Sequence, residues 1–272
     1  MKKLIGLVVL ALASTSVLAS SDTTEVRNLD KFTKIVQGAT ANVYLKQGSP
    51  QKVEVKAKQE MLGNLITEVS GGKLKISNKN QKNNWSWNNS NDYTVYITVE
   101  NVESIDLSGS GNLVATTPVT GNNLELNVSG SGDLEAELAL TGDLDLGITG
   151  SGDVNLKGKF QNLKGHVSGS GDAQLAATVA KQAVLNISGS GDIQVRGKVP
   201  VLEASISGSG DLSAEEFEAE SCQVRVSGSG DAQVFVKNDL DARTSGSGDI
   251  SYKGNPAKVI THNSGSGSVN QI

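Results

Sequence analysis

A chain of 272 residues is long enough for one large domain or two small ones. Its hydrophobic content of 37%, charged content of 19% and net charge of −5 exclude a disordered polyelectrolyte, a collagen and a membrane bundle. The 24 basic residues do not exceed the 29 acidic ones and form no cluster beyond the amino terminus, so we expect no nucleic-acid partner.

The amino terminus has the features of a secretory signal peptide over residues 1–19. Two lysines precede an apolar run over residues 4–13, and small or compact residues end the segment at Ala19. The apolar run is about half the roughly 20 residues that a membrane-spanning helix needs, and no later segment approaches that length. We therefore expect an exported chain that starts at Ser20, has no transmembrane segment, and resides in the periplasm, on the cell surface or outside the cell.

Residues 20–103 are predicted to form a β-rich cap or the first, irregular coils of a larger β structure. The pattern of apolar residues predicts four strands, at residues 40–45, 52–56, 73–77 and 93–99. Between the last two strands lies a polar, Asn-rich stretch over residues 78–92, which we predict to be a loop. This loop contains both tryptophans of the chain, Trp85 and Trp87.

From residue 104 to residue 272 the chain repeats about every 20 residues. The tetrapeptide Ser/Thr-Gly-Ser-Gly occurs nine times, beginning at Ser108, Ser129, Thr149, Ser168, Ser188, Ser207, Ser227, Ser245 and Ser264. An aspartate follows seven of the copies, whereas Asn112 follows the first copy and Ser268 the last. Such departures at both ends are typical of capping repeats.

Between the tetrapeptides, apolar and polar residues alternate, as in Leu124-Glu125-Leu126-Asn127-Val128. This is the period of a half-buried strand, and it excludes a helix. The same parity runs through the motif, so a fully extended strand would point the glycines inward and the serines and aspartate outward. Glycine suits a tight inward position or a sharp bend with positive φ.

Alignment of the repeats places residues of one kind in columns. The position before the tetrapeptide holds Leu107, Val128, Ile148, Val167, Ile187, Ile206 and Val226. It becomes Thr244 and then Asn263 at the carboxyl end, where we expect the stack to stop and face water. Cys222 falls in another column with leucines and alanines, so we predict a small buried apolar side chain there.

Columns of this kind suit coils that stack in register, with equivalent strands pairing at about 4.8 Å. We therefore predict an all-β fold, a single-stranded parallel β-helix (solenoid) with coils of about 20 residues. A propeller blade would need roughly twice this period, and the Leu/Asn signature of leucine-rich repeats is absent.

The repeated Ser-Gly-Ser-Gly-Asp, the β-only pattern and the segments Phe32-Thr33-Lys34-Ile35-Val36 and Val43-Tyr44-Leu45 resemble a known bacterial family. This family is described as "putative autotransporter adhesin head" domains, the GIN domain. The resemblance covers roughly Val26 to Ile272. It implies a β-helix, in agreement with the columns, and adhesion as the role.

A catalytic site on a β-helix needs a local cluster of acids, bases or metal ligands. The chain instead places an aspartate in every middle repeat, and its only two histidines, His166 and His262, fall on outward positions nearly five repeats apart. We therefore expect no catalytic residue and no enzymatic activity.

The sharpest chemical feature is the column of aspartates that follow the tetrapeptides, namely Asp133, Asp153, Asp172, Asp192, Asp211, Asp231 and Asp249. Carboxylates about 5 Å apart repel each other by about 0.8 kcal/mol per neighbouring pair in water. Aspartate side chains commonly accept backbone N–H groups in bends, so we expect a structural role and no cofactor. The alternative is a cation site, because stacked oxygens could coordinate calcium.

Trp85 and Trp87 would lie on one side of an extended segment and are the candidate ligand-binding residues. Exposed aromatic rings flanked by amides are suited to binding sugars, because the ring faces stack on sugar C–H groups while the amides supply hydrogen-bond donors and acceptors. The alternative is a disordered insertion whose rings fold back onto the helix.

We expect a non-enzymatic, exported binding or adhesion module that recognises cell-surface or extracellular polysaccharide, or another cell-envelope component. Two alternatives from other classes stay open. One is a polysaccharide-processing β-helix enzyme, either a lyase or a hydrolase, and the other is an envelope scaffold without a small ligand.

Overall fold

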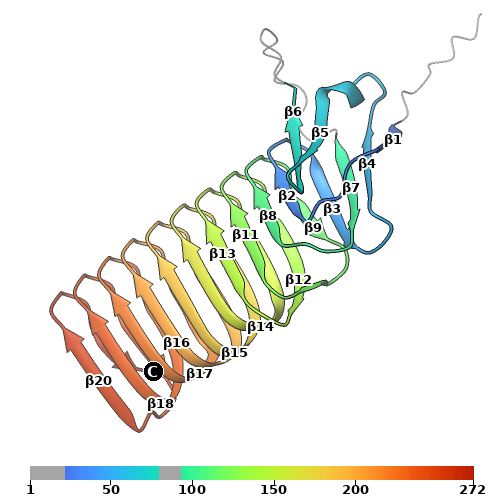
Figure 1. Cartoon of the computed structure of the whole chain (residues 1–272). Coiled ribbons are helices and arrows are strands. Elements are labelled where there is room, and N and C mark those ends of the chain that lie inside the picture. Colours follow the sequence, from blue (N-terminus) through green and yellow to red (C-terminus); the bar gives the residue numbers. More distant parts are fainter. Residues whose placement is uncertain (1–21, 80–92) are drawn as a thin grey trace, which may run out of the picture.

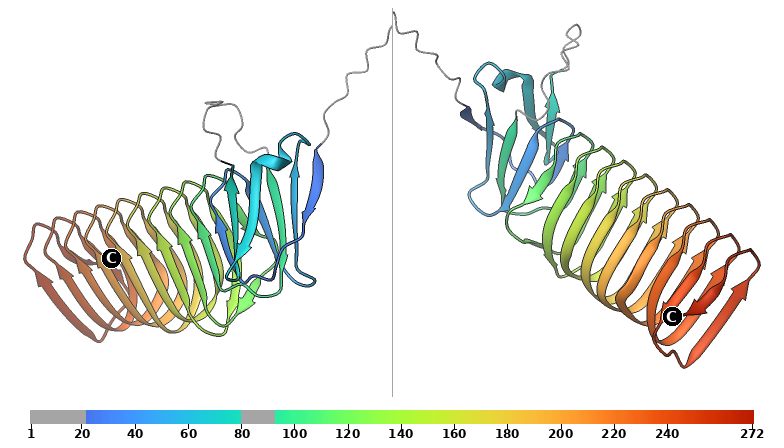
Figure 2. Two further views of the ribbon diagram at one scale, coloured as in Figure 1. Left: turned by 45° about the horizontal axis from the view of Figure 1, so that its top comes forward. Right: turned by 180° about the vertical axis from the view of Figure 1, so that it is seen from behind.

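The structure is a computed structural model that describes residues 22–79 and 93–272. These residues form a rod of stacked β coils with a less regular amino-terminal end (Figure 1; Figure 2). Their only helical element is one turn of 3-10 helix at Leu62–Asn64, so the predicted all-β solenoid is confirmed. The predicted signal peptide and the two tryptophans lie outside the described residues.

The amino-terminal strands are β1 (Thr23–Arg27), β2 (Lys34–Gln37), β3 (Asn42–Gln47), β4 (Lys52–Ala57), β5 (Leu65–Ser70), β6 (Lys73–Asn78) and β7 (Thr94–Val99). Four of them, β3, β4, β6 and β7, lie within two residues of the predicted strands. The other three were not predicted.

The repeats form the remaining strands. The shorter ones are β8 (Ser104–Leu107), β9 (Leu113–Ala115), β10 (Val119–Gly121), β11 (Leu124–Val128), β12 (Leu134–Leu140), β13 (Leu144–Ile148), β19 (Ile250–Lys253), β20 (Lys258–Asn263) and β21 (Val269–Gln271). The longer ones are β14 (Val154–Val167), β15 (Ala173–Ile187), β16 (Ile193–Ile206), β17 (Leu212–Val226) and β18 (Ala232–Thr244).

Each coil contributes one strand segment before the glycine motif and one after it. We call the layer of segments before the motif, such as β11 and β13, the upstream sheet, and the layer after it, such as β9 and β12, the downstream sheet. The longer strands turn from the downstream sheet into the upstream sheet of the next coil; β14 does so at a register shift between Phe160 and Asn162. Apolar side chains from both sheets fill the space between them.

The predicted columns are confirmed by the strand register. In the upstream sheet Val128 pairs with Ile148, and this column continues to Val226. In the downstream sheet Leu134 pairs with Val154, and the equivalent residues follow to Val269. These parallel pairs stack like side chains on one another, so aliphatic residues form nearly the whole core.

The amino-terminal end of the rod is built out of sequence order. Strand β6 pairs in parallel with β2, and β7 pairs in parallel with β3, so β6 and β7 lie before the coil of β2 and β3 although they follow it in the chain. Antiparallel strands β5, β4 and β1 flank this end.

The motif glycines are required by the stacking of the bends. A Cβ atom on Gly130 would overlap the carbonyl oxygen of Gly109 in the preceding coil, and every later motif glycine meets its equivalent in the same way. The missing side chain thus points along the rod, and the expected inward orientation is wrong. Positive φ is not the reason either, because no motif glycine is among the described glycines that have it.

The first bend of the stack has alanines at the positions of the motif glycines. Residues 37–42, with the sequence Gln-Gly-Ala-Thr-Ala-Asn, occupy the motif position of the coil of β2 and β3, and Ala39 and Ala41 stand where later coils have glycine. A Cβ atom is tolerated in this bend, whereas a Cβ atom on Gly109 or Gly111 in the next bend would overlap the carbonyl oxygen of Ala39 or Ala41.

The column before the bend is apolar from Leu107 to Val226, but it is polar at the bend that contains Ala39 and Ala41 and at the last two bends. Gln37 donates through Nε2 to the carbonyl of Ala41, and Asn263 donates through Nδ2 to the carbonyl of Gly267. Thr244 donates through Oγ1 to the Gly248 carbonyl at 3.0 Å. Thr244 is only 2% exposed, so the expectation that it faces water is wrong; β20 covers it, and only Asn263 faces the open end.

Candidate functional site

The aspartate column forms a ladder of hydrogen bonds along the rod. Oδ1 of each aspartate accepts the backbone N–H of the next aspartate at 2.7–2.9 Å. The ladder starts at Asn42 and Asn112, whose amide oxygens take the same role, and ends at the N–H of Ser268. The aspartates do accept backbone N–H groups, but each accepts from the following coil, not from its own bend.

This arrangement engages one oxygen of each carboxylate with the backbone. Within residues 22–79 and 93–272, no group of three or more His, Cys, Asp or Glu side chains is placed to hold a metal ion. Calcium prefers about six to eight oxygens around one point, whereas the ladder offers one carboxylate per coil. A calcium site would therefore have to be built from the second oxygen, Oδ2, of each carboxylate. A chelation experiment tests this alternative.

Cys222 and the two histidines lie where the columns placed them. Cys222 is 4% exposed between Leu202 and Leu240, and burial raises the pKa of its thiol to about 12. His166 and His262 lie on the outer side of the upstream sheet in one column, and the four coils between them hold other residue types at this position. The structure therefore keeps the two histidines apart from each other and from Cys222.

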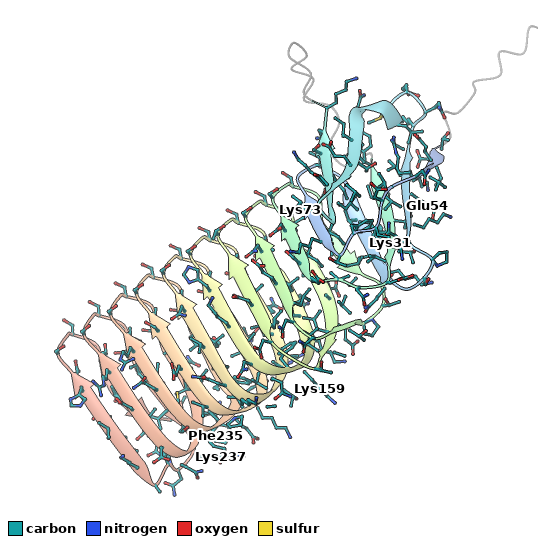
Figure 3. All side chains as sticks on the ribbon, in the orientation of Figure 1. Lys31, Glu54, Lys73, Lys159, Phe235 and Lys237 are labelled. Carbon is teal, nitrogen blue, oxygen red and sulfur yellow. The ribbon has the colours of Figure 1, made fainter. Side chains whose placement is uncertain are left out.

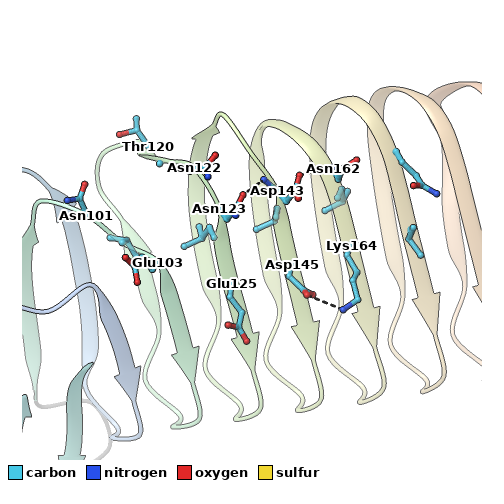
Figure 4. A pocket seen from close by; sticks show the side chains of 17 residues that line it. Asn101, Glu103, Thr120, Asn122, Asn123, Glu125, Asp143, Asp145, Asn162 and Lys164 are labelled. Atoms are coloured by element: carbon cyan, nitrogen blue, oxygen red, sulfur yellow. Dashed lines mark hydrogen bonds and ion pairs between the residues drawn. The ribbon is translucent and has the colours of Figure 1, made fainter. Parts of the chain in front are cut away.

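The upstream sheet carries an open groove of about 950 Å³ at the corner opposite the glycine bends (Figure 4). In later coils the chain enters each upstream strand from the downstream strand of the spatially preceding coil. It enters β8 instead from β7, which lies one coil farther away, beyond β3, through residues 100–103, so the wall of the rod is irregular here. We call this the polar groove. Its polar lining consists of Asn101, Glu103, Thr120, Asn122, Asn123, Glu125, Asp143, Asp145, Asn162, Lys164 and Gln182.

Hydrogen bonds between coils fix several of these side chains. Asn123 Oδ1 accepts the N–H of Asp143 at 2.9 Å, and Asn162 Nδ2 donates to Asp143 Oδ1 at 2.7 Å. Lys164 Nζ lies 3.0 Å from Asp145 Oδ2 and forms an exposed ion pair. The groove thus presents amides and carboxylates at the spacing of the coils.

The charge of the polar groove discriminates against anions. Four carboxylates line it, from Glu103, Glu125, Asp143 and Asp145, against the single cation of Lys164. An anionic ligand would meet net repulsion, whereas hydroxyl groups can donate to the carboxylates and accept from the amides.

Sequence reasoning missed the polar groove. Its lining comes from coil corners, which vary in length and carry no fixed motif, and from residues 101–103, which precede the first repeat strand. The available signal was the spacing of 21 residues between the first two tetrapeptides, together with the adjacent Asn122 and Asn123. That signal marks an irregular corner without showing that it is hollow.

The fold defines a parallel β-solenoid in which stacked Gly-Ser bends join the upstream strand of each coil to its downstream strand. The family model described as "Putative auto-transporter adhesin, head GIN domain" matches residues 31–198 and 180–256. The chain belongs to this family.

Crystal structures of similar proteins share this architecture. A protein described as a "putative lipid binding protein" from Parabacteroides distasonis is 27% identical, with a TM-score of 0.68, and the match covers 93% of this chain and 98% of that one. A "putative adhesin" from the same organism is 21% identical, with a TM-score of 0.72 and the same coverage. A "putative adhesin" from Parabacteroides merdae is also 21% identical, with a TM-score of 0.70, over 93% and 97% of the two chains.

No curated protein matches the chain. In the part of the chain that the structure describes, no helix has the length and apolar character needed to cross a bilayer.

Proposed function

We propose that this chain is an exported, non-enzymatic adhesion module that binds polysaccharide in the polar groove. The family and its structural neighbours support a binding or adhesion role. The observation that carries the choice of ligand is the lining of the groove, in which amides and carboxylates from successive coils face one open space. Sugar hydroxyls both donate and accept hydrogen bonds, and such a lining offers partners for both.

Export to the periplasm or the cell surface is part of the proposal. It rests on the signal-peptide features of residues 1–19 and on membership of an adhesin family. The name of the 27% identical relative raises lipid as a second ligand class. The polar groove favours sugars over acyl chains, because amide and charged side chains line it and a lipid tail would desolvate them.

The carboxylates of the polar groove leave one alternative function open, that of a polysaccharide-processing enzyme. Glu125 and Asp145 are register partners in the groove, and glycosidases use a pair of carboxylates that flank the scissile bond. A screen for hydrolase and lyase activity against neutral and acidic glycans separates the two functions. Reproducible turnover that is lost on a single substitution, such as Asp145→Asn, would overturn the proposal of a non-enzymatic module.

A glycan array with the chain from Ser20 onward tests the proposal, followed by calorimetry of any hit. Asn162→Ala should weaken binding about tenfold, the usual effect of losing one or two hydrogen bonds. Asn238→Ala is the matched control, because Asn238 also donates from a coil corner to an acidic side chain of the preceding coil, here Glu220, but lies outside the groove. Equal effects of the two variants, or no glycan hit, would contradict the proposal.

Trp85 and Trp87 remain a separate prediction. If they bind sugar, replacing both by alanine should weaken binding of the same hit without changing the melting temperature. Unchanged binding would favour the alternative in which the rings fold back onto the helix.

A further inference from the structure

Two tyrosines form an exposed aromatic pair at the amino-terminal end of the downstream sheet. Tyr44 on β3 and Tyr96 on β7 are register partners, with ring centroids 5.5 Å apart and ring planes at 20°. They are 38% and 41% exposed. Rings this close cannot lie side by side in one plane, so they overlap, and only the opposite face of each ring is left for another contact. Together they expose more apolar surface than the single side chains that are normal on protein surfaces.

The face of the Tyr44 ring that is turned away from Tyr96 points along the rod, toward a strip of mostly polar side chains. Its register partner on the next coil is the half-buried Val114, whose short side chain forms a floor beside the ring. From Val114 the same outward position continues, one residue per coil, through Glu135, Asn155, Gln174 and Gln194. We call these residues, with Tyr44, the axial row.

The surface along the axial row is hollowed. One depression, of about 240 Å³, is lined by Glu135, Asn155 and Gln174, among others, and a second, of about 130 Å³, continues past Gln194. The carboxylates of Asp133 and Asp153 border the first depression, so it offers no attraction to anions. On the far side of Tyr96, the carboxylate of Glu54 is neutralised by Lys52 at 2.8 Å (Glu54 is labelled in Figure 3).

We infer that the axial row binds an extended, neutral polysaccharide that runs parallel to the rod. One sugar would stack its C–H groups on the free face of Tyr44 above Val114, and the following sugars would bond their hydroxyls to the amides. The coil spacing of about 4.8 Å is close to the length of one pyranose unit in an extended chain, so successive sugars meet successive coils. This site lies on the opposite sheet from the polar groove and does not depend on it.

Affinity electrophoresis tests this inference with named soluble polymers: hydroxyethyl cellulose and dextran as neutral chains, and polygalacturonate as an anionic one. We expect a neutral polymer to retard the chain and polygalacturonate not to. Tyr44→Ala should weaken retardation at least tenfold, Gln174→Ala about threefold, and Tyr44→Phe little, because the phenyl ring keeps the stacking face. Gln233→Ala is the matched control, since Gln233 occupies the same outward position farther along the rod, outside both depressions.

A purely structural tyrosine pair would give a different result, because cross-strand aromatic pairs also stabilise sheets. The melting temperature of each variant is therefore measured alongside its binding. Gln174 has no side-chain hydrogen bond among the described contacts, so Gln174→Ala keeps the test valid even if Tyr44→Ala unfolds.

Three results would overturn the inference. The first is that neither neutral polymer retards the chain. The second is that retardation is insensitive to Gln174→Ala and Tyr44→Ala but is lost with Asn162→Ala, which would assign the ligand to the polar groove. The third is a dimer that Tyr44→Ala dissociates, which would make the tyrosine pair a contact between copies of the chain.

Discussion

At the scale of single residues, the aspartate ladder explains why a carboxylate recurs where neighbouring carboxylates repel. Each Oδ1 accepts the backbone N–H of the equivalent residue one coil later, a bond that water would otherwise have to make. An amide oxygen serves equally well, since Asn112 binds the N–H of Asp133 at 2.9 Å. The column could be predicted from the repeats. The bonding partner could not, because it lies about 20 residues away in the next coil.

This bonding predicts how Asp192 responds to substitution. Asp192→Asn should leave the free energy of unfolding within about 0.5 kcal/mol, whereas Asp192→Ala should lower it by about 1 kcal/mol, because the N–H of Asp211 loses its partner. Urea unfolding of the two variants measures the difference.

Chelation tests the same residue for calcium. EDTA should leave the melting temperature unchanged if the ladder only supports the backbone. A calcium-dependent rise of several degrees that disappears in Asp192→Asn would show that the ladder is a metal site.

The thiol of Cys222 should be inert in the folded chain. Burial raises its pKa to about 12, so almost none of the reactive thiolate exists at pH 8, and the core also blocks access. Ellman's reagent should therefore label one thiol per chain in denaturant and almost none without it. Rapid labelling of the native chain would show that this coil opens.

At the scale of elements, the bends and the strands differ in how far sequence determines them. Alternation predicted the strands and their faces, because the period of two follows directly from the pleat. The direction of the motif glycines was not predictable in this way, since it depends on the contact between one bend and the next. Likewise, alternation carries no information on which strands pair, so the placement of β6 and β7 ahead of β2 came from the structure alone.

The stacked bends predict a large effect of the smallest side chain. Gly169→Ala should lower the free energy of unfolding by at least about 2 kcal/mol, because its Cβ would overlap the carbonyl oxygen of Gly150, and Gly169→Val should cost more. Gly147→Ala is the control within the repeats, since only the flexible amide of Asn127 lies near its Cβ position. Equal urea midpoints for the Gly169→Ala and Gly147→Ala variants would mean that the bends do not stack this closely.

At the scale of the whole molecule, the chain is a one-dimensional array in which each coil contacts only its neighbours. The family, the fold and the columns could all be read from the repeat. The polar groove and the tyrosine pair could not, because both lie where the repeat is broken: the groove at the entry to β8, and Tyr44 and Tyr96 on strands that precede the first tetrapeptide.

The array predicts a spectrum dominated by β structure. Far-UV circular dichroism of the chain from Ser20 onward should show helical content well below about a fifth, less than the average of globular proteins. A larger helical signal would contradict the solenoid.

The stacked bends also make the rod extensible. Every interior bend offers its neighbour the same backbone surface, so duplication or loss of one repeat of about 20 residues leaves all other contacts unchanged. Each such event would move the two ends of the rod apart or together by about 4.8 Å. The length of the rod can therefore change in evolution without a change in the proposed binding sites. The amino-terminal end keeps its tyrosine pair and polar groove, while the number of coils that follow sets the distance from these sites to the carboxyl-terminal end.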